Sequence, residues 1–164
     1  MTFPRLLLPS TAALGIVVAL SGCAPIVHLE QAAAANDPVC AEVIVRLPAS
    51  LGEQPRVWTD AQATAAWGSP SAVLLRCGLE PPAPTTQQCV SLGGADWIVD
   101  ESDSPNLRLT TYGREPAVQV SVDTTTISAD SVLESLAGAV MQIPATRACT
   151  GPTSDDADSG EAAP

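Results

Sequence analysis

Four cysteines in the central part of the chain restrict its folding more than any other feature. Cys40, Cys77, Cys89 and Cys149 are an even number, and in an exported protein an even set predicts two disulfides, with three possible pairings. We favour Cys77–Cys89, which would close the proline-rich stretch GLEPPAPTTQQ, and Cys40–Cys149, which would join the two ends of the folded region. A metal site is the weaker alternative, because no two cysteines have C-x-x-C spacing and the only histidine, His28, lies outside the bracketed region.

The start of the chain predicts export. Arg5 precedes 15 uncharged residues, Leu6–Leu20. That run is too short for a membrane-spanning helix of roughly 20 residues and is typical of a signal peptide, here residues 1–22. The sequence LSGC that ends at Cys23 resembles the bacterial lipobox. The resemblance implies a lipid on the Cys23 thiol and a mature chain anchored at the extracytoplasmic face of the cell membrane. The alternative is an ordinary secreted protein in which Cys23 is unpaired.

The charge balance of the chain is acidic and excludes some partners. Removing residues 1–22 from the 164 leaves 142, enough for one domain with a core. Eighteen acidic residues oppose seven arginines, with no lysine, and loss of Arg5 takes the net charge from −11 to −12. We therefore expect no nucleic-acid partner and no polybasic attraction to anionic lipid.

Composition divides the mature chain into three parts. Residues 23–38 are expected to form a lipidated tether, spanning roughly 20–25 Å if flexible. Residues 150–164 are small, acidic and rich in proline and glycine, which predicts a disordered tail. A single disulfide-held domain is expected between them, over residues 39–149.

Strands are predicted where apolar and polar residues alternate. The stretches NLRLTTY (106–112) and AVQVSVD (117–123) alternate clearly and are joined by GREP, so we expect an antiparallel hairpin in which Pro116 opens the second strand. Shorter candidates are EVIVRLP (42–48), AVLLRCG (72–78) and DWIV (96–99).

Two helices are predicted from their end signals. Thr59 and Gln62 fit a capping box that opens an alanine-rich stretch ending at Gly68 and Pro70. Residues 128–144 place apolar side chains on one helical face, with Ser128 or Ser131 as the cap. Hairpin strands with two helices covering one face predict an α+β fold with a small antiparallel sheet.

Several stretches of the predicted domain resemble a known family. AWGSPSAVLLRCG and TTYGREPAVQVSV, with DW between them and a late cysteine, are similar to an actinobacterial family of exported lipoproteins that carries only a domain-of-unknown-function label. The resemblance covers roughly residues 39–149 and implies a cell-envelope protein of a high-GC Gram-positive bacterium. It implies no catalytic residue. The residues that carry it are Trp67, Gly68, Pro70, Arg76, Cys77, Cys89, Trp97, Tyr112, Gly113, Arg114 and Cys149.

The usual catalytic groups are missing from the predicted domain. Covalent catalysis needs a nucleophile with a nearby base, yet His28 lies in the expected tether and the chain has no lysine. No glycine-rich phosphate loop occurs. We expect no cofactor and no enzymatic activity.

A carboxylate cluster leaves two weaker alternatives open. Asp96, Asp100, Glu101 and Asp103 lie close in sequence. They could act as an acid–base pair on a glycosidic bond or bind calcium with help from Asn106. The spacing matches no standard loop, so a solvated acidic turn is the favoured interpretation.

Arginine and aromatic residues form the better candidate for binding. Arg76 and Tyr112 are expected on strands, as is Arg108, and Arg114 at the tip of the hairpin. With Trp97 nearby they would suit protein contacts or a carboxylate or phosphate group, although buried tryptophans and locally paired arginines are the ordinary alternative. The leading hypothesis is a non-enzymatic lipoprotein that binds an envelope protein. The second is a binder of a cell-wall fragment or anionic precursor, and the third a carboxylate hydrolase.

Overall fold

A computed structural model describes residues 26–150, and residues 1–25 and 151–164 lie outside the described part. Two helices and nine strands occur in residues 26–150. In chain order they are β1 (Ile26–Val27), α1 (Pro38–Val45), β2 (Ser50–Leu51), β3 (Gln54–Thr59), β4 (Thr64–Trp67), β5 (Val73–Leu79), β6 (Cys89–Leu92), β7 (Ala95–Asp103), β8 (Asn106–Thr111), β9 (Ala117–Asp123) and α2 (Ala129–Val140).

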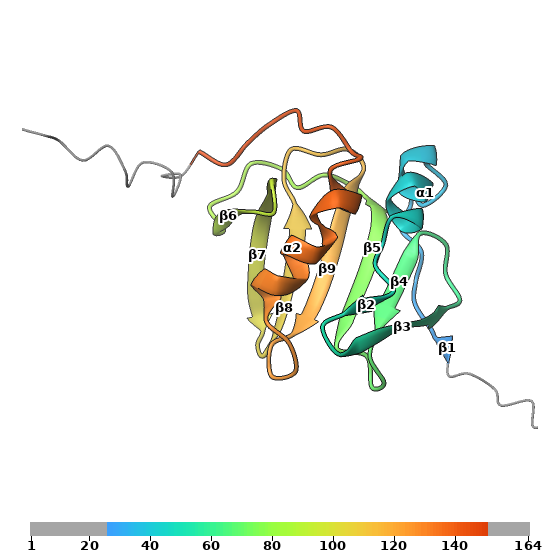
Figure 1. Cartoon of the computed structure of the whole chain (residues 1–164). Helices are drawn as coiled ribbons and strands as arrows, with labels where there is room; N and C mark the ends of the chain where they lie inside the picture. The colour runs from blue at the N-terminus through green and yellow to red at the C-terminus, as the bar shows by residue number, and fades with distance from the viewer. Residues whose placement is uncertain (1–25, 151–164) are drawn as a thin grey trace, which may run out of the picture.

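The strands form one open sheet in the order β1-β3-β4-β5-β9-β8-β7-β6, with β2 paired to β3 (Figure 1). Every pair is antiparallel except β1 with β3, which is parallel. The predicted α+β class, a mostly antiparallel sheet with two helices and two disulfides, is confirmed.

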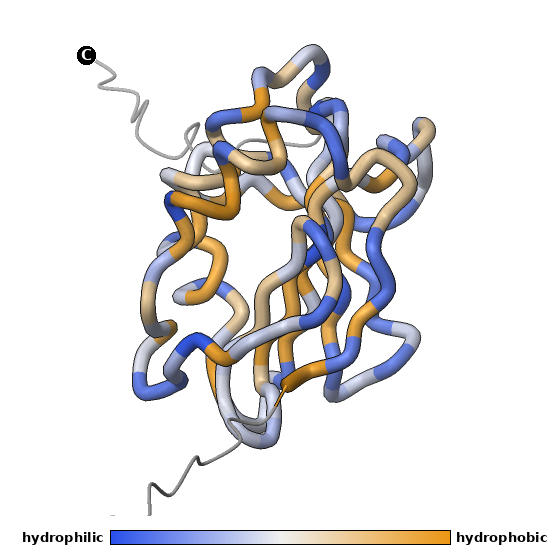
Figure 2. Tube along the Cα trace, turned by 90° about the vertical axis from the view of Figure 1, so that its right-hand side faces the viewer, coloured by the Kyte–Doolittle hydropathy of each residue, from blue (hydrophilic) through white to orange (hydrophobic). Residues whose placement is uncertain are grey.

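Both helices lie on the same face of the sheet and enclose the core. Helix α2 contacts β6 and β9, while α1 contacts β5 and α2. Val118, Val120 and Val122 on β9 are fully buried beneath this layer, as strand alternation requires when one face is covered. Figure 2 shows hydrophobic stretches both in the strands and in the helical layer, alternating with hydrophilic ones.

The predicted hairpin and the second predicted helix are confirmed. Strands β8 and β9 pair in antiparallel register, with Leu109 opposite Val120. Helix α2 starts after Ser128, which occupies the cap position without a side-chain cap hydrogen bond. The expected strands at residues 72–78 and 96–99 are present as β5 and β7.

The predicted strand at residues 42–48 is wrong, because helix α1 occupies Pro38–Val45. The Asp37 side chain accepts a hydrogen bond of 2.9 Å from the Val39 amide, and Pro38 stands in the first turn, where its missing N–H costs nothing. This cap outweighs the β-branched residues that suggested a strand. The helix places Cys40 and Val43, three residues apart, in the core.

The helix predicted from the Thr59–Gln62 capping box is also wrong, because β3 and β4 form a hairpin there. The Thr64 hydroxyl donates to the Ala61 carbonyl oxygen at 2.6 Å and lies 2.8 Å from the Thr59 hydroxyl. These bonds close a turn in which Ala63 has φ 55°. The alanine-rich stretch is fully buried as β4, so small side chains serve close packing here.

The favoured disulfide pairings Cys77–Cys89 and Cys40–Cys149 are wrong. The bonds are Cys40–Cys77 and Cys89–Cys149, with Cα separations of 5.6 and 5.8 Å. Strands β9, β8 and β7 separate β5, which carries Cys77, from β6, which carries Cys89. Four strand spacings amount to about 19 Å, too far for a disulfide. Helix α1 instead brings Cys40 onto β5.

The folded domain begins before residue 39, so the expected tether over residues 23–38 is too long. Strand β1 pairs with β3, and the Ala34 amide donates to the Gly78 carbonyl oxygen at 2.9 Å. This close approach needs glycine, because a Cβ at residue 78 would lie 2.5 Å from the Ala34 carbonyl carbon. Residues 1–25 and the predicted tail beyond residue 150, with the proposed lipid site, lie outside the described residues.

Candidate functional site

The four predicted binding residues do not share one surface. Trp97 is fully buried, and its Nε1 donates to the Leu92 carbonyl oxygen at 3.2 Å. Arg114 is only 6% exposed. Tyr112 is half-buried, and its amide donates to the Asp96 carbonyl oxygen at 2.7 Å. Burial makes the expected surface roles of Trp97 and Arg114 wrong.

Arg114 is a structural residue because the C-terminal segment covers it. Its guanidinium donates to the carbonyl oxygen of Ile143, and to that of Gly94 at 3.1 Å. Its backbone forms an isolated antiparallel bridge with Ala145. Burial lowers the pKa of Arg114, and the negative charge of Asp96 acts in the opposite direction. No local sequence pattern predicted that residues 143–147 would pack over the hairpin.

The structure instead brings Arg76 together with Arg108. Arg76 on β5 lies opposite Gln119 on β9, and Arg108 on β8 lies opposite Ser121 on the same strand. Cross-strand partners point to the same face of a sheet, and this is the face away from the buried valines of β9. Both arginines line a hollow of ≈ 350 Å³. Its lining residues are His28, Leu29, Glu30, Leu74, Arg76, Arg108, Gln119 and Ser121.

A second hollow of ≈ 300 Å³ continues the first along the sheet. The two share Leu74, Arg108 and Ser121, so we treat them as one surface and name it the arginine groove. The second hollow adds Ser71, Ala72, Asp103, Asn106, Leu107, Val122 and Asp123.

The two arginines of the groove differ in their partners. Arg76 donates to Gln119 Oε1 at 2.7 Å, and Gln119 Nε2 donates to Thr110 Oγ1 at 3.2 Å. Arg108 forms an ion pair of 3.1 Å with Asp100. Within residues 26–150, the ion pairs shorter than 4.0 Å do not include Arg76. Arg76 is thus a half-buried cation held in place by a neutral side chain.

His28 forms part of the groove rim rather than part of a tether. Its Nδ1 lies 2.5 Å from Asp60 Oδ2, and the Leu29 amide donates to Asp60 Oδ1 at 3.0 Å. The hydrogen bond with His28, followed by that from Leu29, lowers the pKa of the Asp60 carboxyl. These contacts fix the segment after β1 against the β3–β4 turn.

The acidic cluster is occupied by local hydrogen bonds. Asp96 accepts from the Ser91 hydroxyl at 2.5 Å and from the Cys149 amide at 2.7 Å. Hydrogen bonds from Ser102, followed by the charge of Arg108, lower the pKa of Asp100. In the part of the chain that the structure describes, no three His, Cys, Asp or Glu side chains meet so as to hold a metal ion. The proposed calcium site therefore has no such cluster of ligands in residues 26–150.

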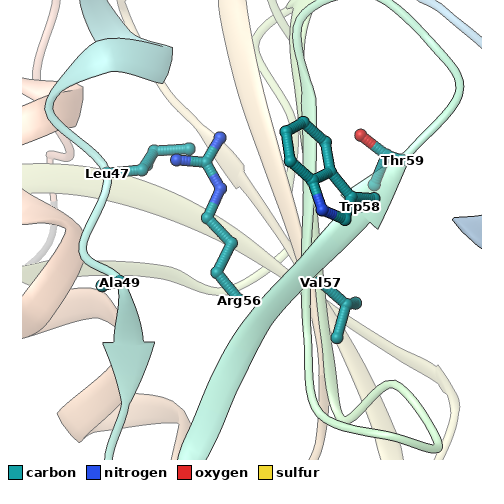
Figure 3. A pocket seen from close by; sticks show the side chains of 6 residues that line it. All are labelled: Leu47, Ala49, Arg56, Val57, Trp58 and Thr59. Carbon is teal, nitrogen blue, oxygen red and sulfur yellow. The ribbon is translucent and has the colours of Figure 1, made fainter. Parts of the chain in front are cut away.

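A separate cleft of ≈ 610 Å³ lies on the helical side of β3 (Figure 3). We name it the Trp58 cleft; its lining residues are Leu47, Ala49, Arg56, Val57, Trp58 and Thr59. Arg56 donates to the Ile44 carbonyl oxygen at 3.3 Å, and its guanidinium carbon lies 5.9 Å from the centre of the Trp67 ring. Burial lowers the pKa of Arg56. Trp58 is 74% exposed, and we did not predict it as a site residue.

The fold and surfaces define a disulfide-stabilised α+β domain with an open polar sheet face. Residues 11–148 match the family described as "Protein of unknown function (DUF3515)". The chain belongs to this family, which confirms the resemblance at the level of a domain of unknown function. No curated protein and no solved structure matches the chain. Within residues 26–150, neither helix has the length and apolar character needed to cross a bilayer.

Proposed function

We propose that the protein is an actinobacterial lipoprotein of the cell envelope, anchored through lipid on Cys23 at the extracytoplasmic face of the membrane. The uncharged run Leu6–Leu20 and the LSGC sequence support export and lipidation. Two disulfides in a domain of this size are typical of an oxidising compartment outside the cytoplasm. The domain would then act at the outer surface of the membrane.

In this proposal the domain is a non-enzymatic module that binds an acidic segment of an envelope protein in the arginine groove. The observation that carries it is the placement of Arg76 and Arg108 on the open sheet face, where both line one hollow across β9. Guanidinium groups recognise carboxylates through paired hydrogen bonds. The groove continues over Leu74 and Ser121 into the second hollow, which Asp103 and Asp123 line. An extended segment would therefore place its acidic residues over Arg76 and Arg108 and uncharged or basic residues over the second hollow.

The local chemistry of the carboxylates supports a binding role over hydrolysis. A glycosidase needs a carboxylic acid whose pKa is raised so that it can protonate a leaving group. The pKa of Asp100 is lowered instead, and both oxygens of Asp96 accept hydrogen bonds. No contact in residues 26–150 favours the hydrolase alternative.

Crosslinking in living cells tests this function. A photoreactive residue replaces Ser121, in the middle of the groove, and a second strain carries it at exposed Ser135 on α2. One discrete protein product from position 121 alone, lost in Arg76→Gln but kept in Arg147→Gln, is the expected result. Equal products from both positions, or none from position 121, would contradict a protein partner in the groove.

Arg76 also favours a second candidate, a small anionic ligand such as a cell-wall fragment or an anionic precursor. Its guanidinium has only the neutral Gln119 as a side-chain partner among the described residues, so an incoming carboxylate or phosphate displaces no resident anion. Calorimetric titration with purified anionic wall fragments would show saturable binding that Arg76→Gln weakens at least tenfold. A crosslinked smear that wall-degrading enzymes remove would favour this candidate over a protein.

A further inference from the structure

Three of the four exposed large hydrophobic side chains of the described residues belong to elements at one end of the sheet, the corner near β1. The four are Ile26, 55% exposed, Val45 and Trp58, each 74% exposed, and Met141, 54% exposed. Three of the four belong to β1, β3 and the end of α1, on the right-hand side of Figure 1. Isolated exposed hydrophobics are ordinary, but a group of them indicates an interaction site.

Ile26 and Trp58 lie on paired strands, and one hydrogen bond joins β3 to the helix that ends at Val45. Ile26 is the register partner of Trp58 in the parallel β1–β3 pair, so the two side chains leave the sheet on the same face. The hydrogen bond from Arg56 to the Ile44 carbonyl oxygen joins β3 to the last turn of α1. Val45 follows Ile44 at the end of α1, and Trp58 is two residues from Arg56 on β3.

This corner lies close to the proposed lipid in the covalent chain. Cys23 precedes Ile26 by three residues, and three residues span at most about 11 Å even when fully extended. The residues after Val27 do not lengthen this link, since His28 and Leu29 contact Asp60 and Ala34 contacts Gly78. A lipid on Cys23 must therefore hold the β1 edge of the sheet at the membrane surface.

We infer that Ile26, Val45 and Trp58 form a membrane-seating surface that enters the lipid interface beside the anchor. The inference rests on the proposed lipidation of Cys23. Tryptophan suits the interface between the lipid chains and the headgroups, because its ring is apolar and its N–H finds hydrogen-bond partners among the headgroups. Arg56 lines the same cleft as Trp58, so a cationic side chain lies beside the tryptophan, where lipid phosphates would be met.

The acidic groups near this corner are engaged in local contacts. Glu42 pairs with Arg46, Asp60 forms hydrogen bonds with His28 and the Leu29 amide, and Asp37 accepts from the Val39 amide at the start of α1. The opposite sheet edge, β6, carries the Cys89–Cys149 bond to the C-terminal segment. Seating the β1 edge leaves β6 on the side away from the bilayer, with the arginine groove on the exposed sheet face between them.

Tryptophan fluorescence tests the seat, because Trp58 is exposed whereas Trp67 and Trp97 are fully buried. The mature lipidated protein, purified from membranes, is reconstituted into vesicles of phosphatidylcholine with phosphatidylglycerol. Some vesicles carry lipids brominated near the headgroup end of the chains. The tryptophan emission should shift to the blue and should be quenched by brominated lipid. Both changes should be lost in Trp58→Phe. A matched variant, Met141→Leu, should keep both.

Separate outcomes distinguish the seat from the anchor. If the protein carries no lipid and does not float with vesicles, the proposed function fails and the seat falls with it. If it floats but Trp58 is quenched by aqueous acrylamide and not by brominated lipid, the anchor stands and the seat is overturned. Shielding from both quenchers would assign the corner to a second copy of the chain, which also overturns the inference.

Discussion

Arg114, in the connection between β8 and β9, donates a hydrogen bond to the carbonyl oxygen of Ile143, which lies beyond the end of α2. The same guanidinium reaches the Gly94 carbonyl oxygen in the β6–β7 turn. One side chain therefore joins three segments that are far apart in sequence. Its charge strengthens these hydrogen bonds, and its burial removes it from any role in ligand contact.

Replacing Arg114 with alanine should destabilise the domain by about 2–3 kcal/mol, because the buried carbonyl oxygen of Ile143 and the partly buried one of Gly94 lose a charged donor. Denaturant unfolding at neutral pH measures the change. Arg147→Ala is the control, since the Arg147 side chain is exposed, and it should change stability by no more than about 0.5 kcal/mol. Equal effects of the two variants would contradict the structural role of Arg114.

Replacing Gly78 with alanine should detach the segment before α1 from β5. Gly78 has φ +104°, and an added Cβ would lie 2.5 Å from backbone atoms of Ala34 and Ala35. We expect a loss of about 2–4 kcal/mol and faster amide hydrogen exchange in residues 26–37, measured by mass spectrometry.

Gly138→Ala provides the opposite control within the same chain. Gly138 lies inside α2, and an added Cβ would meet nothing within 4 Å. Alanine there should stabilise the domain by about 0.5–1 kcal/mol. If Gly78→Ala leaves both the stability and the amide hydrogen exchange of residues 26–37 unchanged, these residues are not packed on β5.

The two disulfides should differ in their resistance to reduction. Cys40 and Cys77 are fully buried, whereas Cys89 and Cys149 are half-buried. A limiting amount of a thiol reductant should therefore open Cys89–Cys149 first, which differential alkylation and peptide mass spectrometry would detect. The bonds close sequence separations of 37 and 60 residues, so losing either should cost about 4 kcal/mol on the chain-entropy model. Peptides joining Cys77 to Cys89 would contradict the observed topology.

Long, bounded patterns predicted their elements correctly. The alternation of residues 117–123 and the helical spacing of residues 128–143 are sustained and end in turn residues, so local preference and packing agree. The segments 38–45 and 59–67 are short, and their local signals conflict. In the first, the Asp37 cap and the Cys40–Cys77 bond favour a helix over β-branched propensity. In the second, burial of β4 between β3 and β5 favours a strand.

The candidate site depended on pairings that alternation alone does not specify. Arg76 and Arg108 line one hollow because β9 alone separates β5 from β8, a strand order that no local pattern encodes. Arg114 is buried because the segment after α2 returns over the hairpin. The sequence indicated which residue types would matter, while the arrangement of segments decided which of them face the solvent.

The pH dependence of stability should include a contribution from Asp123, the last residue of β9. Asp123 Oδ1 accepts hydrogen bonds from the Thr125 amide at 2.9 Å and its hydroxyl at 2.6 Å, and Oδ2 accepts from the Thr126 hydroxyl at 3.0 Å. These bonds, those of Thr125 first, favour the carboxylate and lower the pKa of Asp123 in the folded protein.

Since the folded-state pKa is lowered, the stabilisation from Asp123 is present above its unfolded pKa of about 3.9 and is lost as the pH falls through the folded pKa. Asp123→Asn should therefore be less stable than the native protein at neutral pH, and the difference should shrink below about pH 4. Thermal unfolding of both proteins from neutral to acid pH measures this difference. Glu134→Gln, at an exposed position on α2, controls for the loss of one negative charge. A difference between Asp123→Asn and the native protein that stays constant down to acid pH would show that the charge of Asp123 does not stabilise this turn.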